Sequence, residues 1–271
     1  MNLFTIAKET GMFLVLAVSI GVLLFFVSKN RLTQNNSYSV LLFSLFLVII
    51  PETLQEDSMV LSNCFVLLAM RRIVSLKRKT NTKKKLFDAA FWIAIASLFY
   101  FWSILFFVLI LLALLIYAIE DIKNWLVPFL GFGTVALLCA CYYSLTENGF
   151  GKIEQLYAGV SLDVSLYNNL SISVGIVMLL VLGFWSALFY YKTIGDQTQS
   201  IKASFAVVFI AFLLGIFASL LSPDKNGSEF IFAFAPLAII MANYIETRKK
   251  KWISELYMGF IITTLIILLF L

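Results

Sequence analysis

Long apolar runs, separated by short polar segments, make up most of the chain. The runs are Gly11–Val27, Tyr38–Ile50, Met59–Met70, Ala89–Ile119, Trp125–Tyr143, Leu170–Tyr190, Ala203–Leu221, Phe230–Tyr244 and Leu256–Leu271. A helix needs about 20 predominantly apolar residues to cross the hydrocarbon core of a bilayer, so uncharged runs of this kind predict transmembrane helices. Tyr38–Ile50 and Met59–Met70 are short, and we expect them to take in flanking residues or to lie among longer neighbours.

The run Ala89–Ile119 is too long for one ordinary crossing and short for two, and the charges decide between these alternatives. If the run is a hairpin that turns near Phe99–Trp102, 17 of the 20 lysines and arginines share one face, and three lie on the other. A single tilted crossing changes this split to 12 and 8. Basic residues concentrate on the cytoplasmic side of membrane proteins, so the hairpin is favoured. The sequence therefore predicts ten spans, with both termini on the outer face.

The composition places the chain among integral membrane proteins. It is 62% hydrophobic and 13% charged, whereas a soluble domain is about 45–50% apolar and about 25% charged. We therefore predict an all-α, polytopic transmembrane helical bundle, with residues 1–271 as a single transmembrane domain. The first run lacks a basic leading segment and a small-residue cleavage site, so we expect it to be retained as a span. The net charge of +5 is interpreted as a sign of topology, and no nucleic-acid partner is expected.

The residue types exclude several kinds of chemistry. The chain has no histidine, which excludes histidine-held metals, Ser-His-Asp triads and histidine proton relays. Cys64, Cys139 and Cys141 all lie in apolar runs without C-x-x-C spacing, and we expect them to be buried as small hydrophobic side chains. No metal and no cofactor is expected. No span carries a charge near its middle, which disfavours an ion-coupled transporter.

One inner segment is strongly basic, and it reads RRIVSLKRKTNTKKK from position 71 to position 85. Its eight basic residues are Arg71, Arg72, Lys77, Arg78, Lys79, Lys83, Lys84 and Lys85. Such a segment anchors the topology, and it also attracts anionic lipid headgroups at about 1 kcal/mol per basic residue. Besides the lipid bilayer itself, the predicted partners are therefore anionic lipid headgroups at the inner face, with another membrane protein as a further partner.

Two outer segments offer polar candidates for substrate binding. They read PETLQEDS and SPDKNGSE, and the candidates are Glu52, Glu56, Asp57, Asp224, Lys225 and Glu229. Paired carboxylates serve as acid and base or hold a divalent cation, and residues four apart share a face if the segment is helical. The alternatives are a solvated loop for the first segment and a tight turn for the second. The longest outer segment, Asn148–Asn169, is expected to lie along the surface as an interfacial helix.

The order of these features resembles the GT-C superfamily of membrane glycosyltransferases, which use polyprenyl-phosphate sugars. The resemblance covers Pro51–Trp125, where an acidic outer turn precedes a short span, a basic inner loop and two short spans hinged at the outer face. It also covers Ser222–Tyr244, which has Pro236 where those enzymes have a proline. It implies a GT-C-like arrangement of helices. Those enzymes carry a catalytic acid in a long first outer loop, which this chain lacks, and a phosphate-gripping base where this chain has Glu229. We therefore expect Glu229 to repel a lipid phosphate, and the catalytic residues, if any, stay unknown.

A second stretch, KKKLFDAAFWIAIASLFYFWSILFF at Lys83–Phe107, is similar to an uncharacterised Bacteroidota (flavobacterial) family of integral membrane proteins. This resemblance implies a multi-pass protein of the bacterial inner membrane, and a further N-terminal span and outer segment before the present start. It implies no activity.

Two classes of function follow from the sequence. The first is an accessory or scaffold membrane protein with a GT-C-like helical core and no chemistry of its own. The alternative is a GT-C-related glycosyltransferase that uses a polyprenyl-phosphate-linked sugar at the outer face. An outer pocket lined by carboxylates and at least one Lys or Arg would favour the enzyme, and a filled outer face would favour the scaffold.

Overall fold

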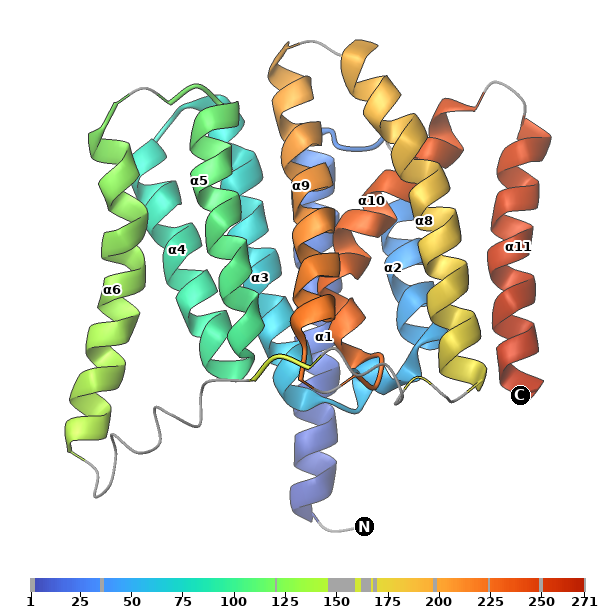
Figure 1. Cartoon of the computed structure of the whole chain (residues 1–271), viewed down its shortest axis with the longest axis horizontal. Helices are drawn as coiled ribbons and strands as arrows, with labels where there is room; N and C mark the ends of the chain where they lie inside the picture. The colour runs from blue at the N-terminus through green and yellow to red at the C-terminus, as the bar shows by residue number, and fades with distance from the viewer. Residues whose placement is uncertain are drawn as a thin grey trace.

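The computed structural model describes residues 3–34, 37–119, 121–145, 159–161, 167, 170–196, 199–223, 225–248 and 251–270. Within these ranges the chain is an up-and-down bundle of ten α-helices (Figure 1). The helices are α1 (Leu3–Asn30), α2 (Tyr38–Ile49), α3 (Asp57–Val74), α4 (Thr82–Phe99), α5 (Phe106–Ile116), α6 (Lys123–Ser144), α8 (Leu170–Asp196), α9 (Gln199–Leu221), α10 (Ile231–Thr247) and α11 (Lys251–Phe270). Short 3₁₀ turns are η1 (Pro51–Leu54), η2 (Ser75–Arg78), η3 (Phe101–Leu105) and η5 (Ser228–Phe230).

Six segments of the described chain are long and apolar enough to cross a membrane, and they correspond to α1, α3, α6, α8, α9 and α10. The apolar helices α2, α5 and α11 are shorter, and α4 carries Lys83, Lys84 and Lys85 in its first turn. The all-α prediction is confirmed, because each apolar run of the sequence is helical. The protein is therefore a multi-pass membrane protein.

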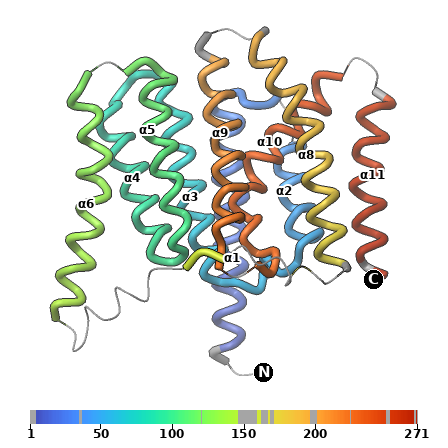
Figure 2. Tube along the Cα trace, in the orientation of Figure 1, coloured from blue at the N-terminus to red at the C-terminus, as the bar shows by residue number. Residues whose placement is uncertain are grey.

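The run Ala89–Ile119 folds as a helical hairpin, as the charge distribution predicts. Helix α4 ends at Phe99, and Tyr100 has an extended backbone with φ −145° and ψ 112°. The turn η3 then leads into α5, which runs back beside α4 (Figure 1). Trp102 in this turn donates a hydrogen bond from Nε1 to the carbonyl of Gly159 at 3.3 Å. Because this run reverses direction, the two chain ends lie at the same end of the bundle (Figure 2).

Helix α10 is the centre of the bundle. Every residue from Ile231 to Ile245 is buried, and α2, α3, α8, α9 and α11 pack around it. Gly215 lets α9 approach closely, since a Cβ atom there would lie 2.8 Å from the Cα of Ala233. Buried apolar surface contributes about 25 cal/mol per Å² within a protein in water, but in lipid, close packing of this kind carries helix association instead.

Helix α6 lies at the edge of the bundle and packs mainly on α4. Only 17% of the residues in its most apolar stretch are buried. This position corrects the prediction that all three cysteines are buried. Cys64 in α3 is buried, Cys139 in α6 is half-buried and Cys141 in α6 is exposed, because much of the surface of α6 has no protein neighbour.

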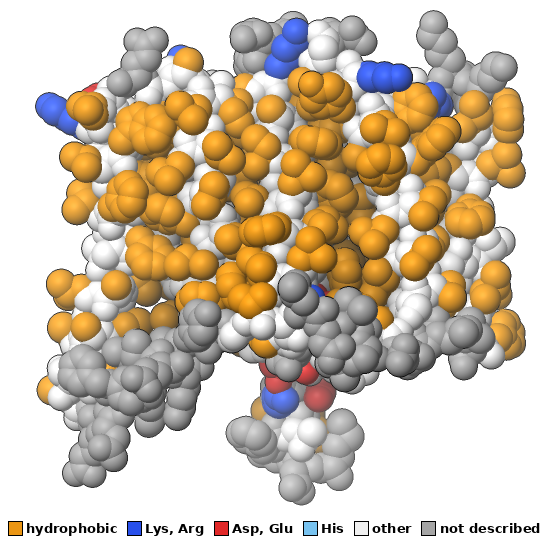
Figure 3. Space-filling model, viewed as in Figure 1, with side chains coloured by type: hydrophobic (Ala, Val, Ile, Leu, Met, Phe, Trp, Pro, Cys, Tyr) orange, Lys and Arg blue, Asp and Glu red, His pale blue; other side chains and the backbone are white. Residues whose placement is uncertain are grey.

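The two ends of the bundle differ in charge. Arg71, Arg72, Arg78 and Lys85 lie at the end where α1 and α3 finish, which we call the basic end. The opposite, acidic end carries η1 and η5 with Glu52 and Glu229, and both termini extend toward it. Figure 3 shows lysine and arginine side chains along the basic end, a wide apolar band below them, and carboxylates beside a basic side chain at the acidic end.

Candidate functional site

The structure brings the two acidic-end segments together, although they are far apart in the sequence. The turns η1 and η5 pack against one another. Asn226 donates a hydrogen bond from Nδ2 to Oε1 of Glu56 at 3.4 Å, and the hydroxyl of Ser228 donates to the sulfur of Met59 at 3.1 Å. Gly227 between them has φ +97°, a left-handed conformation that favours glycine. The sequence predicts a tight turn here, and the geometry agrees.

Glu229 is completely buried in this turn. Its Oε2 accepts a hydrogen bond from the backbone N–H of Gly227 at 3.0 Å, and its Oε1 accepts one from the hydroxyl of Tyr167. Burial, reinforced by this carboxylate, raises the pKa of the Tyr167 phenol well above its ordinary value, so Tyr167 stays a neutral donor. The side chain of Glu229 therefore points into the protein, and its expected repulsion of a lipid phosphate stays a prediction.

Lys225 is also buried, with 2% of its surface exposed. Its ammonium donates to the carbonyl of Leu220 at 2.8 Å and to that of Ser219 at 3.4 Å. These carbonyls belong to the last turn of α9, which has no further helical donors of its own. The ammonium also attracts the carboxylate of Glu229. Lys225 thus closes the end of α9 and compensates a buried charge.

The carboxylates of the first acidic segment lie on different elements. Glu52 is in η1, whereas Glu56 precedes α3 and Asp57 begins it. Asp57 forms an ion pair with Lys8 of α1 at 2.5 Å, and the two side chains are 32% and 52% exposed. Glu52 and Glu56 are half-buried, so the segment is less solvated than its sequence predicts, because η1 packs on η5. Asp224 lies outside the described residues, as does most of Asn148–Asn169.

The partners of Glu229 carry no sequence signal that identifies them. Tyr167 follows the mixed segment SLDVSL. Ser219, whose hydroxyl donates to the Glu229 carbonyl at 3.0 Å, lies in an apolar run. Within the described ranges, no three His, Cys, Asp or Glu side chains gather as metal-binding groups do. Among the described residues, the acidic end thus contains one buried, mutually bonded polar cluster and one half-exposed ion pair.

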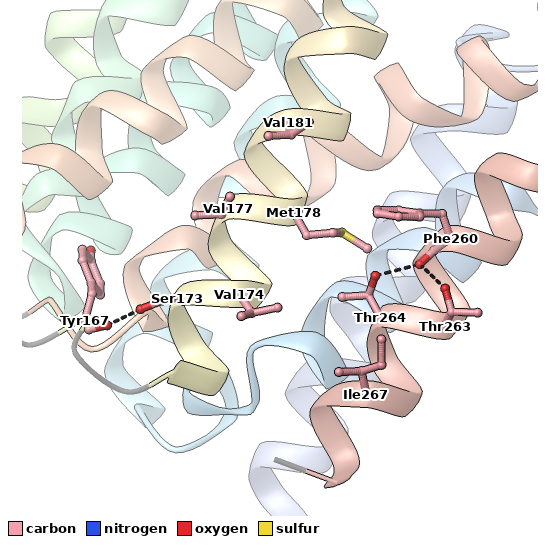
Figure 4. Close-up of a pocket in the computed structure, with 10 residues that line it drawn as sticks. All are labelled: Tyr167, Ser173, Val174, Val177, Met178, Val181, Phe260, Thr263, Thr264 and Ile267. Atoms are coloured by element: carbon pink, nitrogen blue, oxygen red, sulfur yellow. Dashed lines mark hydrogen bonds between the residues drawn. The ribbon is translucent and has the colours of Figure 1, made fainter.

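An apolar groove of about 660 Å³ lies between α8 and α11. Val174 and Met178 of α8 point toward Phe260 and Ile267 of α11 across it (Figure 4), and Val177 of α8 also lines it. Tyr167 and Ser173 lie at its acidic end, where the hydroxyl of Ser173 donates to the carbonyl of Tyr167 (Figure 4). None of the described residues that line the groove is charged. It therefore suits a hydrocarbon chain and offers no clamp for a phosphate.

A second cavity, of about 210 Å³, lies at the basic end, and we call it the cationic cavity. Its charged lining residues are Lys29, Arg71, Arg72, Arg78 and Lys85. They come from the end of α1, the end of α3, η2 and the start of α4. Four of them belong to the basic segment that the sequence identifies. Lys29 is added only by the fold, which brings the end of α1 beside that segment.

Specific contacts hold the side chains around the cationic cavity. Arg72 forms an ion pair with Asp88 at 2.9 Å, and Lys85 donates to the carbonyl of Ser75 at 2.7 Å. Arg78 donates from Nη2 to the carbonyl of Lys29 at 3.2 Å. The ring of Phe25 also lines the cavity. The cavity is thus built from fixed side chains rather than from loosely extended ones.

The other four basic residues of the segment lie elsewhere. Lys77 and Lys79 line a different hollow of about 490 Å³, together with Lys202. Lys83 and Lys84 are exposed on the first turns of α4 and do not line the cationic cavity. The fold therefore divides a segment that is uniform in sequence into groups with different surroundings.

Comparison with known proteins adds a family to this description. Neither the curated proteins nor the solved structures gave a match. The model of DUF6427, described as a family of unknown function, matches residues 2–271. The match agrees with the predicted resemblance to a family without an assigned activity, and the chain belongs to the DUF6427 family.

Proposed function

We propose that this chain is a non-catalytic accessory or scaffold protein of the bacterial inner membrane, whose basic end contacts anionic lipid headgroups at the inner face. The observation that carries the proposal is the burial of Lys225 and Glu229 at the acidic end. A catalytic acid or base must come within hydrogen-bond reach of its substrate. These two side chains are instead bonded to the turn and helix end that they hold together.

The energetics of buried charge support this structural role. A buried ionised group is strongly unfavourable unless it is paired and hydrogen-bonded. Glu229 has donors from Gly227 and Tyr167, and Lys225 has two carbonyl acceptors. Opening this cluster to a substrate would remove those bonds, so the arrangement favours a fixed connection over a reactive site.

The charge distribution supports the lipid contact. The described basic residues of the segment from Arg71 to Lys85 lie at one end of the bundle. Each basic residue near an anionic membrane surface contributes about 1 kcal/mol. Eight of them therefore hold this end firmly at a headgroup layer, which is the position that the topology predicts for the inner face.

One observation favours the alternative, a GT-C-related glycosyltransferase. The groove between α8 and α11 runs along the apolar band and ends at Tyr167, which suits a polyprenyl chain. The part of its lining that the structure describes lacks the Lys or Arg that a lipid phosphate needs. The groove therefore supports lipid contact more strongly than it supports sugar transfer.

Native mass spectrometry of the purified chain with added polyprenyl phosphate tests the proposal. We expect retention that falls to background at high salt, because the charges of the basic end are exposed or half-exposed and are therefore screened by salt. Stoichiometric retention that resists salt and is lost in Val177→Trp, which fills the groove, would favour the glycosyltransferase. Leu188→Trp is the matched control, since Leu188 is an exposed residue of α8 that does not line the groove.

A further inference from the structure

The cationic cavity concentrates positive charge beyond what its surroundings compensate. Five basic side chains line it, and within the described part of the chain the ion pair at this site is that of Arg72 with Asp88. Lys29, Arg72 and Arg78 all lie close enough to Lys85 to repel its ammonium. Like charges held together in this way are unfavourable unless an anion joins them.

The cations are oriented before any ligand arrives. The ring of Phe25 lies under two of them, with the guanidinium carbon of Arg71 at 4.6 Å and Nζ of Lys29 at 4.8 Å from its centroid. Asp88 fixes Arg72, and the carbonyl of Lys29 fixes Arg78. A guanidinium carries five N–H donors, so one such contact leaves donors for a ligand. Side chains that are already ordered lose less entropy on binding.

The size and the donor set match a phosphate group. The volume of about 210 Å³ compares with about 30 Å³ for one water molecule in the liquid, so a phosphate and part of its alcohol fit. Guanidinium forks bind phosphate oxygens in pairs, with charge-assisted hydrogen bonds. The cavity also lies where the helices end, at the level expected for headgroups.

We propose that the cationic cavity is a discrete site for one phosphate group, carried by a lipid headgroup or by a water-soluble phosphate ester. The inference rests on the proposed function in assigning anion contact to the basic end, and it goes further by assigning that contact to five side chains. A diffuse patch would use Lys83 and Lys84 equally, because they lie on the same helix as Lys85 and are more exposed.

Paired variants of equal charge distinguish a site from a patch. Arg71→Gln with Arg78→Gln removes two cations from the cavity, and Lys83→Gln with Lys84→Gln removes two beside it. The full chain in phosphatidylcholine nanodiscs is melted against rising inorganic phosphate, and in parallel in nanodiscs that also contain phosphatidic acid. Loss of one hydrogen bond between a charged side chain and the phosphate weakens binding at least about tenfold. We expect the affinity for phosphate or phosphatidic acid to fall by at least about tenfold in the variant with Arg71→Gln and Arg78→Gln. In the variant with Lys83→Gln and Lys84→Gln it should change within about twofold.

The outcomes distinguish a lipid phosphate from a soluble one, and failure of the discrete site from failure of the lipid contact at the basic end. Stabilisation by phosphatidic acid alone identifies a lipid ligand, stabilisation by phosphate alone identifies a soluble one, and both support the site. Equal weakening in both variants overturns the site and leaves lipid contact at the basic end standing. If neither inorganic phosphate nor phosphatidic acid stabilises the protein, both the discrete site and the lipid contact at the basic end are overturned. The variant with Arg71→Gln and Arg78→Gln should fold without ligand, because it relieves repulsion between like charges. If it does not fold, Lys29→Gln, at an exposed position, repeats the test.

Discussion

The close approach of α9 to α10 gives a prediction whose sign is set by the structure. In Gly215→Ala, the added Cβ would lie 2.8 Å from the Cα of Ala233, 2.9 Å from its nitrogen and 2.9 Å from the carbonyl oxygen of Phe232. These are backbone atoms of the central helix, so no side chain can turn away to make room. The two helices must separate instead.

The magnitude follows from two opposing effects. Overpacking of a close-packed interior costs about 1–3 kcal/mol, and the contact with backbone atoms puts this site at the upper end. Alanine in place of glycine within a helix recovers about 1 kcal/mol. We therefore expect a net loss of about 2 kcal/mol. At about 2–4 °C per kcal/mol for a chain near this size, the melting temperature should fall by about 4–8 °C.

The control is Gly21→Ala in α1, where an added Cβ has nothing within 4 Å. Only the gain in helix propensity applies there, so its melting temperature should rise by about 2–4 °C. Tryptophan fluorescence of the detergent-purified protein follows both transitions, since the chain has five tryptophans. A Gly215→Ala protein as stable as the unmodified chain would refute the packing of α9 on α10 described above.

Two further predictions concern topology and the buried cluster. In a chain without its native cysteines, Asn226→Cys should react with an impermeant thiol reagent in intact spheroplasts, and Thr82→Cys should not; the reverse pattern would contradict the predicted orientation. Tyr167→Phe removes the hydroxyl donor to the buried carboxylate of η5 and should lower stability by about 1–3 kcal/mol. An unchanged melting temperature would show that this bond is not formed in solution.

The helices and the hairpin were predictable because a membrane leaves the backbone few choices. Inside the bilayer, an apolar segment must satisfy its backbone N–H and C=O groups without water, and a helix does so within one segment. The hairpin at Tyr100 has no glycine or proline to mark it. The asymmetry of lysine and arginine still identifies it, because each additional crossing reverses the side of every later loop.

The site was predictable only in part, because its partners meet through tertiary packing. Arg71 and Arg78 lie in a conspicuous basic segment, but Lys29 joins them only because α1 ends beside α3. Composition likewise cannot distinguish the buried carboxylate of Glu229 from the half-exposed one of Glu56. That difference depends on Tyr167, which is distant in sequence and has no motif around it. The charge pattern of the sequence thus indicates at which end of the bundle a residue lies, but not which residues line a pocket there.

The central position of α10 has a consequence for the order of assembly. Helices α2, α3, α8 and α9, which pack on it, all precede it in the chain, and synthesis proceeds from the N-terminus. Until the segment Ile231–Thr247 enters the bilayer, the surfaces that α10 will cover must contact lipid or one another. Insertion of the earlier spans and closure of the bundle are therefore separate events. The native arrangement is completed only when a segment translated after those four helices takes its place at the middle.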